Sequence, residues 1–225
     1  MKRVDLLSPT LREVQIPYSE FYYQIVEKSY LPLPVQFPDT PFAEVLSARQ
    51  TRRAFKVIPD DILNSLLWHS ARAITVGPPS QRWQHRPSPS AGGRHPIDLF
   101  IIQSQNNTHQ MYLYEPVPHA LSKLRIADQI LLEQFLVLVD GIVQLEEATI
   151  IWFGAQFGRT LSKYENGDSL VWRDAGALLM TISLVAEFLG LNCCALGITG
   201  EPSFSRILES REKVSGVGGL LIGDR

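Results

Sequence analysis

The chain has 225 residues, of which 45% are hydrophobic, so it can bury a sizeable core, and we expect one large domain rather than two small ones. Its 21 basic and 23 acidic side chains leave a net charge of -2, which gives no electrostatic basis for binding nucleic acid or an anionic membrane surface. We find no signal-type apolar segment near the start and no stretch of membrane-spanning length, so we expect a cytoplasmic protein without nucleic-acid or membrane partners.

The two cysteines and five histidines give no indication of a metal site. Cys193 and Cys194 are adjacent in an apolar run, where a disulfide between neighbours would be strained and a metal ion would lack further ligands. The histidines do not have ligand spacing. The chain also contains no Walker loop, dinucleotide-binding glycine motif, zinc-protease motif or serine-hydrolase motif. We expect two small buried thiols and no bound metal.

Residues 1–40 form a predicted N-terminal extension in front of a domain that covers residues 41–225. The extension has little periodicity, but it is rich in proline and aromatic residues, and so many aromatic side chains favour burial over a disordered leader. We expect it to pack against another surface, such as that of a partner subunit. Its aromatic cluster consists of Tyr18, Phe21, Tyr22, Tyr23 and Tyr30.

A short helix is predicted from Pro41 to Ala48, with Thr40 as its N-cap. It leads into the segment Arg49-Gln50-Thr51-Arg52-Arg53-Ala54-Phe55, which we call the arginine motif. Three arginines and a hydroxyl within five residues can hold a phosphate through charge-assisted hydrogen bonds. The same residues can also form a solvated basic patch at a helix C-terminus, and the residues alone leave both interpretations open.

A loop of small residues, Pro89-Ser90-Ala91-Gly92-Gly93-Arg94-His95-Pro96, follows a predicted helix over 59–71 and a polar, proline-rich loop over 77–88. We call it the glycine loop. Because glycine has no side chain, such a backbone can approach a flat ligand closely. Most loops of this composition are simple turns, so the glycine loop alone does not identify a ligand.

The rest of the chain alternates strands and helices without an internal repeat. A hairpin turn over 105–109 joins predicted strands over 97–103 and 110–114. The helix predicted over 173–189 is apolar almost all round, as in a domain core or a dimer interface, and Gly190 fits its C-cap. The other predicted elements are helices over 128–146 and 203–209, a polar segment over 158–172, and strands over 148–153, 192–198 and 217–223. This order predicts an α+β fold with a central, mostly antiparallel sheet.

The arginine motif resembles the Arg-Arg-Ser-x-Arg-x-Phe opening of the FMN-dependent nitroreductase superfamily. Within it, the chain is most similar to the azoline dehydrogenases of thiazole/oxazole-modified peptide pathways, the streptolysin-S-type oxidases. The similarity covers residues 42–223, and the joint order of its motifs is more specific than any one of them. Besides the arginine motif and the glycine loop, the motifs are Lys163-Tyr164, Asp174-Ala175-Gly176 and Leu189-Gly190-Leu191-Asn192.

The resemblance implies a nitroreductase-like fold, an intertwined homodimer and FMN bound noncovalently at the dimer interface. The arginine motif would hold the phosphate and ribityl chain, the glycine loop would line the isoalloxazine ring, and a later strand end would approach another part of the ring. The FMN-binding residues implied by position are Arg49, Gln50, Thr51, Arg53, Pro89, Ser90, Ala91, Gly92, Ala195, Leu196 and Gly197. Gln50 stands where the family often has arginine, so fewer charges would face the phosphate.

Lys163 and Tyr164 match the catalytic Lys-Tyr pair of this branch. Oxidation of a thiazoline or oxazoline to the aromatic azole needs a base that removes a ring proton and a flavin that accepts a hydride. A lysine or tyrosine can act as this base only where its surroundings favour its deprotonated form. Judged from its polar neighbours alone, the pair could equally belong to a solvated loop.

The resemblance favours an FMN-dependent oxidase of azoline rings in a ribosomally made peptide natural product, working in a complex with a cyclodehydratase. Two alternatives stay open. One is an NAD(P)H-dependent reductase of nitroaromatics or quinones, a common activity of the wider superfamily. The other is a non-catalytic scaffold protein that keeps the fold and has lost the flavin.

Overall fold

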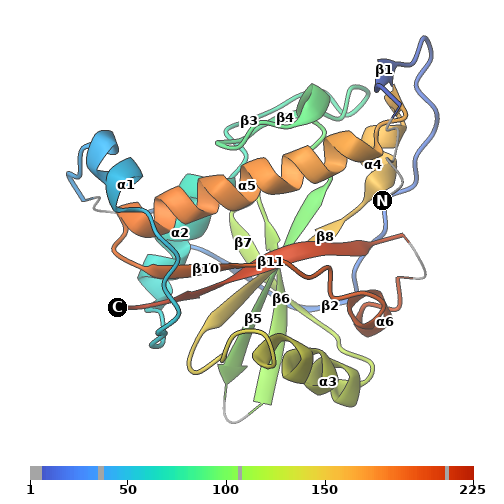
Figure 1. The fold of residues 1–225 in the computed structure, drawn as a ribbon. Coiled ribbons are helices and arrows are strands. Elements are labelled where there is room, and N and C mark those ends of the chain that lie inside the picture. Colours follow the sequence, from blue (N-terminus) through green and yellow to red (C-terminus); the bar gives the residue numbers. More distant parts are fainter. Residues whose placement is uncertain (1–6, 35–37, 106–107, 211–212) are drawn as a thin grey trace, which may run out of the picture.

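A seven-stranded sheet with helices on both faces forms the centre of the molecule (Figure 1). The computed structural model describes residues 7–34, 38–105, 108–210 and 213–225. The strands are β1 (Thr10–Leu11), β2 (Ile25–Tyr30), β3 (Thr75–Val76), β4 (Gln84–His85), β5 (Ile97–Gln105), β6 (Thr108–Glu115), β7 (Ala120–Leu124), β8 (Thr149–Ala155), β9 (Tyr164–Glu165), β10 (Asn192–Leu196) and β11 (Ser215–Gly223). The helices are α1 (Phe42–Ala48), α2 (Asp60–Ala71), α3 (Gln129–Asp140), α4 (Phe157–Leu161), α5 (Asp168–Phe188) and α6 (Ser203–Ile207), with a single 3-10 turn, η1 (Ala91–Gly93).

The large sheet has the strand order β10-β11-β8-β5-β6-β7-β2, and each pair of neighbours is antiparallel. The predicted α+β class with an antiparallel central sheet is therefore confirmed. Strand β8 lies inside the sheet between β11 and β5, and all seven of its residues are buried, because its apolar sequence faces helices on both sides of the sheet.

The two faces of the sheet carry separate apolar cores. On one face α2 and α5 pack against the sheet through residues such as Leu66, Ile151 and Ile182. On the other face α3 and α6 pack around Phe135, Trp152 and Phe204. Successive residues of a strand point to opposite faces, so Ile151 and Trp152 serve different cores.

The described part of the N-terminal segment packs on its own chain. Strand β2 forms the outer edge of the large sheet beside β7, and β1 pairs with β9. Tyr23 is packed within the chain, where it donates a hydrogen bond to Asp98 at 2.7 Å and contacts Phe100. Tyr22 and Tyr30 are 83% and 73% exposed, so the predicted burial of the aromatic cluster is wrong for these two residues. The division of the chain at residue 40 stays a prediction.

Several predicted element boundaries differ from the structure, each for a local reason. Pro41 rather than Thr40 is the N-cap of α1. Helix α3 ends at Asp140, six residues before the predicted end, because Gly141 closes its last turn through a backbone hydrogen bond to Val137.

Short elements also occur where no helix or strand was predicted, because their partners stabilise them. Strand β4 pairs with β3, and β7 pairs with β6. Helix α4 begins at Phe157, and it and β9 occupy much of the first part of the predicted polar segment.

Helix α5 begins at Asp168, five residues earlier than predicted, and Gly190 at φ +75° follows its end as expected. By length and composition alone this helix could cross a membrane, so the expectation that no stretch reaches that length is wrong. The core helix of a globular domain meets the same criterion, and Val171, Ile182 and Ala186 of α5 are fully buried against α2 and the sheet.

The core beneath α3 gives a stability test with a matched control on the same helix. Phe135 is 0% exposed and packs edge-to-face on Trp152 at 4.8 Å between ring centroids, whereas Val137 is 72% exposed. We expect Phe135→Ala to lower the free energy of unfolding by about 3–5 kcal/mol through lost burial and a cavity. Val137→Ala should change it by less than about 0.5 kcal/mol. Urea denaturation followed by fluorescence measures both, and equal effects would contradict the assignment of this core.

Candidate functional site

The glycine loop touches the Lys163–Tyr164 pair. Gly92 has φ +62°, a left-handed conformation that favours glycine. A Cβ atom at this position would stand only 2.8 Å from both Lys163 Nζ and the Tyr164 hydroxyl oxygen. Lys163 Nζ also lies 5.8 Å from the centroid of the Tyr164 ring. The two motifs are far apart in sequence, and the structure brings them into contact at the first of the two glycines of the loop.

Asp174 of α5 anchors the glycine loop. Its carboxylate accepts a hydrogen bond from Ser90 Oγ at 2.6 Å and one from the Ala91 amide at 3.1 Å. Ser90 Oγ in turn accepts the His95 amide at 2.8 Å, which closes the loop on itself. Burial raises the pKa of Asp174, and the two hydrogen bonds only partly oppose this shift. The loop is therefore held on the helix by its own backbone and by one hydroxyl.

A buried ion pair holds α4 against the start of β5. Arg159 of α4 donates to both carboxylate oxygens of Asp98, at 2.7 and 3.1 Å, and to the His95 carbonyl at 3.2 Å. It also donates to Glu20 at 3.0 Å. Burial alone would raise the pKa of Asp98, but Arg159 and the hydrogen bonds from Gln156 and Tyr23 together lower it.

The arginine motif lies beside the start of β10. The Arg52 amide donates to the Cys193 carbonyl at 3.0 Å, and its guanidinium pairs with Glu187 near the end of α5. Arg52 is thus a structural residue. The arginine motif has four further polar side chains, those of Arg49, Gln50, Thr51 and Arg53. Within the described residues none of these four side chains takes part in a hydrogen bond or an ion pair.

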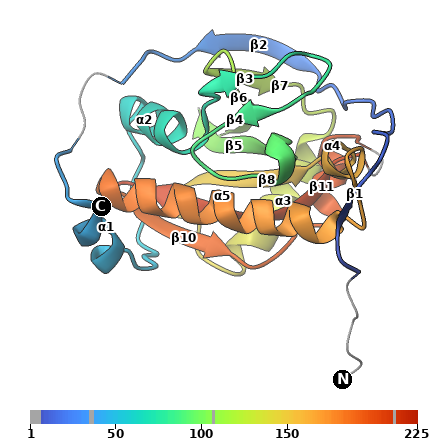
Figure 2. The same cartoon turned by 90° about the horizontal axis from the view of Figure 1, so that it is seen from above.

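The structure does not bring the arginine motif to the glycine loop within one chain. The motif is fixed at Glu187 and the loop at Asp174, and a rise of about 1.5 Å per residue separates these positions by about 20 Å along α5. Figure 2 shows the same separation, with α1 beside the C-terminal end of α5 and α4 near its N-terminal end. Strand β10 runs back beneath α5 between them. At its end Ala195 and Gly197 are exposed, whereas the Leu196 side chain is buried.

Three residues that organise the site received no role from the sequence. Asp174 is an acidic residue within an apolar helix, and such a residue is rarely buried without a partner, so its position was a usable signal. Asp98 and Arg159 lie in different elements, and nothing in the sequence indicates that they meet. Among the described residues no cluster of histidine, cysteine and acidic side chains could hold a metal ion, and Cys193 and Cys194 are free and buried as predicted.

Comparison with known proteins relates the chain to one family. The model of the Nitroreductase family matches residues 46–223. A candidate nitroreductase from Ralstonia eutropha JMP134 has a similar structure, with a TM-score of 0.66 and 19% identity over 93% of this chain and 97% of the other. A chain of the E. coli microcin synthetase McbBCD complex, solved with truncated pro-MccB17 bound, has a TM-score of 0.62 and 18% identity over 85% of this chain and 75% of the other.

A candidate nitroreductase from Anabaena variabilis ATCC 29413 is similarly related, with a TM-score of 0.62 and 19% identity over 86% of this chain and 41% of the other. No curated protein matches the chain. At these identities the solved structures agree with this chain in fold, and the nitroreductase-like fold predicted from the motifs is confirmed.

The ion pair of Asp98 and Arg159 predicts a defined response to acid. Because the pKa of Asp98 is lower in the folded protein than its ordinary value of 3.8, its contribution to stability is present above that value and is lost as the pH falls through the folded pKa. We expect Asp98→Asn to reduce the free energy of unfolding at neutral pH by about 3 kcal/mol, since it leaves Arg159 buried with fewer acceptors.

The measurement is the free energy of unfolding of both proteins from neutral pH to about pH 3. The difference between the two curves should shrink as the pH falls below about 3.8, because the stability that the lowered pKa of Asp98 provides is then progressively lost. Asp39→Asn, at an exposed carboxylate, should follow the wild-type curve throughout. A constant difference between Asp98→Asn and the wild type across this range would contradict the proposed coupling.

Proposed function

Because this chain belongs to the nitroreductase family, we propose that it is an FMN-dependent oxidoreductase that converts azoline rings into azoles in a ribosomally made peptide. The observation that carries this proposal is the contact of Gly92 with Lys163 and Tyr164. It joins a loop suited to a flat ring to two side chains that can move a proton. A redox enzyme that only reduces its substrate through the flavin has no evident need for this pair.

The residues of the chain fit FMN. At Gly92 the ends of the Lys163 and Tyr164 side chains take the place of a Cβ, so the missing side chain lets this pair lie against the backbone of the glycine loop. The guanidinium groups of Arg49 and Arg53 have no protein partner among the described residues and can bind a phosphate. When bound, the flavin would supply the two-electron chemistry. The proposed binding site would also include Thr51, the Ala91 backbone and the backbone of Ala195–Gly197. The other residues implied by the resemblance would complete it.

In this proposal Lys163 Nζ or the Tyr164 hydroxyl takes the proton from the azoline ring. The pair is held by two supports, since Arg159 fixes α4 just before it and Asp174 fixes the glycine loop that faces it. A base fixed in this way does not need to reorganise when the substrate arrives.

We further propose that two copies of the chain form the complete site. The glycine loop and the arginine motif are attached to α5 about 20 Å apart, which is too far for one subunit to hold both the isoalloxazine ring and the phosphate of the same FMN. An antiparallel contact of α5 with its copy would place the Glu187 end of one helix beside the Asp174 end of the other. The outer face of α5 supports such a contact, because Trp172 is 47% and Met180 42% exposed and no atom lies within 4 Å of a Cβ built at Gly176. An interface of this kind buries exposed apolar surface.

A modified peptide as substrate, and a cyclodehydratase as partner, are supported by the structural likeness to a chain of the microcin synthetase complex that was solved with a truncated propeptide. We place the reaction in the cytoplasm, where ribosomal peptides are made. Reduction of nitroaromatics or quinones by NAD(P)H remains the alternative within the same family.

Replacing the proposed base tests the chemistry. We expect Lys163→Ala and Tyr164→Phe each to reduce azole formation by about 10²–10⁴-fold, because a general base contributes about this much. The amount of bound flavin, measured from its visible absorbance, should stay unchanged. Lys213→Ala, at an exposed lysine, is the control and should be fully active. Azole formation at the normal rate by both site variants would show that this pair is not the base. Rapid bleaching of the flavin by NADH or NADPH, with no azole formed by the wild type, would favour the reductase alternative.

Replacing the arginines tests the cofactor. We expect Arg49→Gln and Arg53→Gln each to weaken FMN binding by about tenfold to a hundredfold, which corresponds to the loss of a charge-assisted hydrogen bond. Riboflavin lacks the phosphate, so its weaker binding should not change in these variants. Arg206→Gln, at an exposed arginine of α6, should bind FMN normally. A protein that stays colourless after addition of FMN would defeat both enzyme functions and favour the scaffold.

A further inference from the structure

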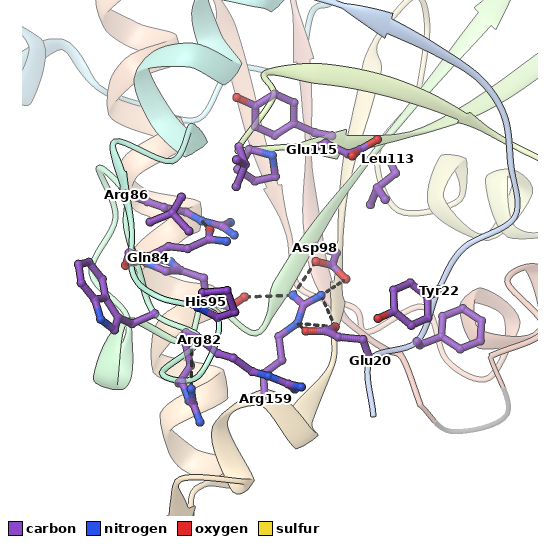
Figure 3. Close-up of a pocket in the computed structure, with 18 of the residues that line it drawn as sticks. Glu20, Tyr22, Arg82, Gln84, Arg86, His95, Asp98, Leu113, Glu115 and Arg159 are labelled. Carbon is purple, nitrogen blue, oxygen red and sulfur yellow. Dashed lines mark hydrogen bonds and ion pairs between the residues drawn. The ribbon is translucent and has the colours of Figure 1, made fainter. Parts of the chain in front are cut away.

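A cavity of about 630 Å³ lies behind the glycine loop and is lined by none of the residues assigned to FMN or to proton transfer. Figure 3 shows it between the N-terminal segment around Tyr22, the end of β6 around Leu113 and Glu115, and the segment that carries Arg82, Gln84 and Arg86. Its volume is that of a typical small-ligand site. Its wall meets the candidate site, since Ser162 precedes Lys163 and Arg94 follows Gly93.

Each acidic side chain of the cavity already has a cationic partner at hydrogen-bond distance. Asp98 and Glu20 both pair with Arg159, at 2.7 and 2.9 Å. Glu115 pairs with Lys28 at 2.8 Å. These three are the carboxylates that line the cavity, and none of them forms an ion pair with another cation of its wall.

Arg86 lines the cavity without an ion-pair partner, as Arg82 and Arg94 do among the described residues. Its Nε donates to the Gln84 side-chain oxygen at 2.9 Å, and within the described residues its guanidinium has no ion-pair partner. Figure 3 shows the side chain reaching into the cavity from the side of Gln84. Burial, followed by the nearby charge of Arg159, lowers the pKa of Arg86 to about 10, so the group is still charged at neutral pH. A partly buried charge without a partner is costly, and an anion in the cavity would offset that cost.

Arg94 adds a second positive charge to the same wall. It is 7% exposed, and four neutral oxygen atoms accept its terminal nitrogens, but no described residue accepts from its Nε. His95 adds no charge, because burial, followed by the charge of Arg86, lowers its pKa to about 3. The neutral ring presents Nε2 to the Gln84 carbonyl at 3.0 Å. The free polar capacity of the cavity is therefore cationic and donor-rich.

The remaining wall selects the kind of anion. Phe21, Tyr22, Trp83, Pro116 and Val117 offer aromatic and apolar surface around the charged centre. A planar guanidinium matches the two oxygens of a carboxylate. A dianionic phosphate suits the cavity less well, because the carboxylates of Glu20, Asp98 and Glu115 also face it.

We propose that this cavity is a second ligand site, which binds the carboxylate of an aromatic or large apolar molecule through Arg86. The carboxylate can belong to a free acid or to an acidic side chain of a peptide. The site does not depend on the flavin, and its occupancy can be measured without any turnover.

The test is titration calorimetry of the full-length protein with 3-phenylpropionate, with its neutral amide, with phenyl phosphate, and with the peptide acetyl-Gly-Phe-Asp-Gly-amide. We expect the carboxylates to bind at least about tenfold more tightly than the amide and the phosphate. Tighter binding of 3-phenylpropionate than of the peptide would identify a free acid as the source of the carboxylate, and the reverse would identify a peptide. Equal binding of acid and amide, or no binding of any probe, would overturn the proposal.

Variants assign the binding to Arg86. Arg86→Gln should weaken carboxylate binding at least about tenfold, Arg86→Lys should weaken it less, and Arg206→Gln should have no effect. Val117 lies at the rim of the cavity and is 56% exposed. Val117→Trp should therefore block the cavity without disturbing a core, and it tests the proposal if Arg86→Gln fails to fold. Unchanged binding in Val117→Trp or in a folded Arg86→Gln variant would place the carboxylate elsewhere. Flavin content and azole formation are measured separately, so this result is independent of the proposed function.

Discussion

The hydrogen-bonded ion pair of Arg159 and Asp98 fixes the relative position of the two halves of the candidate site. Asp98 is the second residue of β5, which follows the glycine loop, and Arg159 lies on α4, which precedes Lys163. The same guanidinium holds the His95 carbonyl at the end of the glycine loop and Glu20 of the N-terminal segment. Because a buried charge must be fully paired, these four segments can only settle together. The contact between Gly92 and the Lys163–Tyr164 pair depends on this arrangement.

Helix α5 provides the second constraint, because it supports both motifs and also separates them. Asp174 binds the glycine loop in its first half, and Glu187 binds Arg52 near its end. A helix is rigid on this scale, so the arginine motif cannot move to the loop within one subunit. The separation is the physical reason for proposing that a second copy completes each flavin site. It also explains why the helix keeps Trp172 and Met180 on its outer face although its inner face is already packed.

The cavity around Arg86 differs in kind from the flavin site. The proposed flavin site is formed by backbone, by a loop without side chains and by arginines at the surface. The cavity is formed largely by side chains of the N-terminal segment and of the segment around β3 and β4, together with Arg94 and His95 of the glycine loop and the end of β6. The sequence indicated only an extension and a loop for the first two segments, since neither has a periodic pattern. Their tertiary packing creates the enclosure, and Arg86 lines it without an ion-pair partner among the described residues.

Much of the fold was predictable from local patterns. Continuous apolar runs indicated the central strands β5, β8 and β11, and helical periodicity indicated α2, α3 and α5, because burial on one or both faces leaves a direct mark on the sequence. Short elements such as α4, β4 and β9 left no such mark, since they exist through the partners that they meet in space. The end of α3 was predicted too late because an apolar pattern continued past Gly141.

The sequence by itself determined the α+β class, the family resemblance and the types of residue available for chemistry, since these depend on composition, periodicity and the order of motifs. Only the tertiary structure decided which of those residues meet. It placed Gly92 against Lys163 and Tyr164, gave Arg52 to Glu187 rather than to a ligand, and left the arginine motif about 20 Å from the glycine loop. Contacts of this kind join distant segments through buried charges and hydrogen bonds, and the local sequence carries no record of the partner that each group will find.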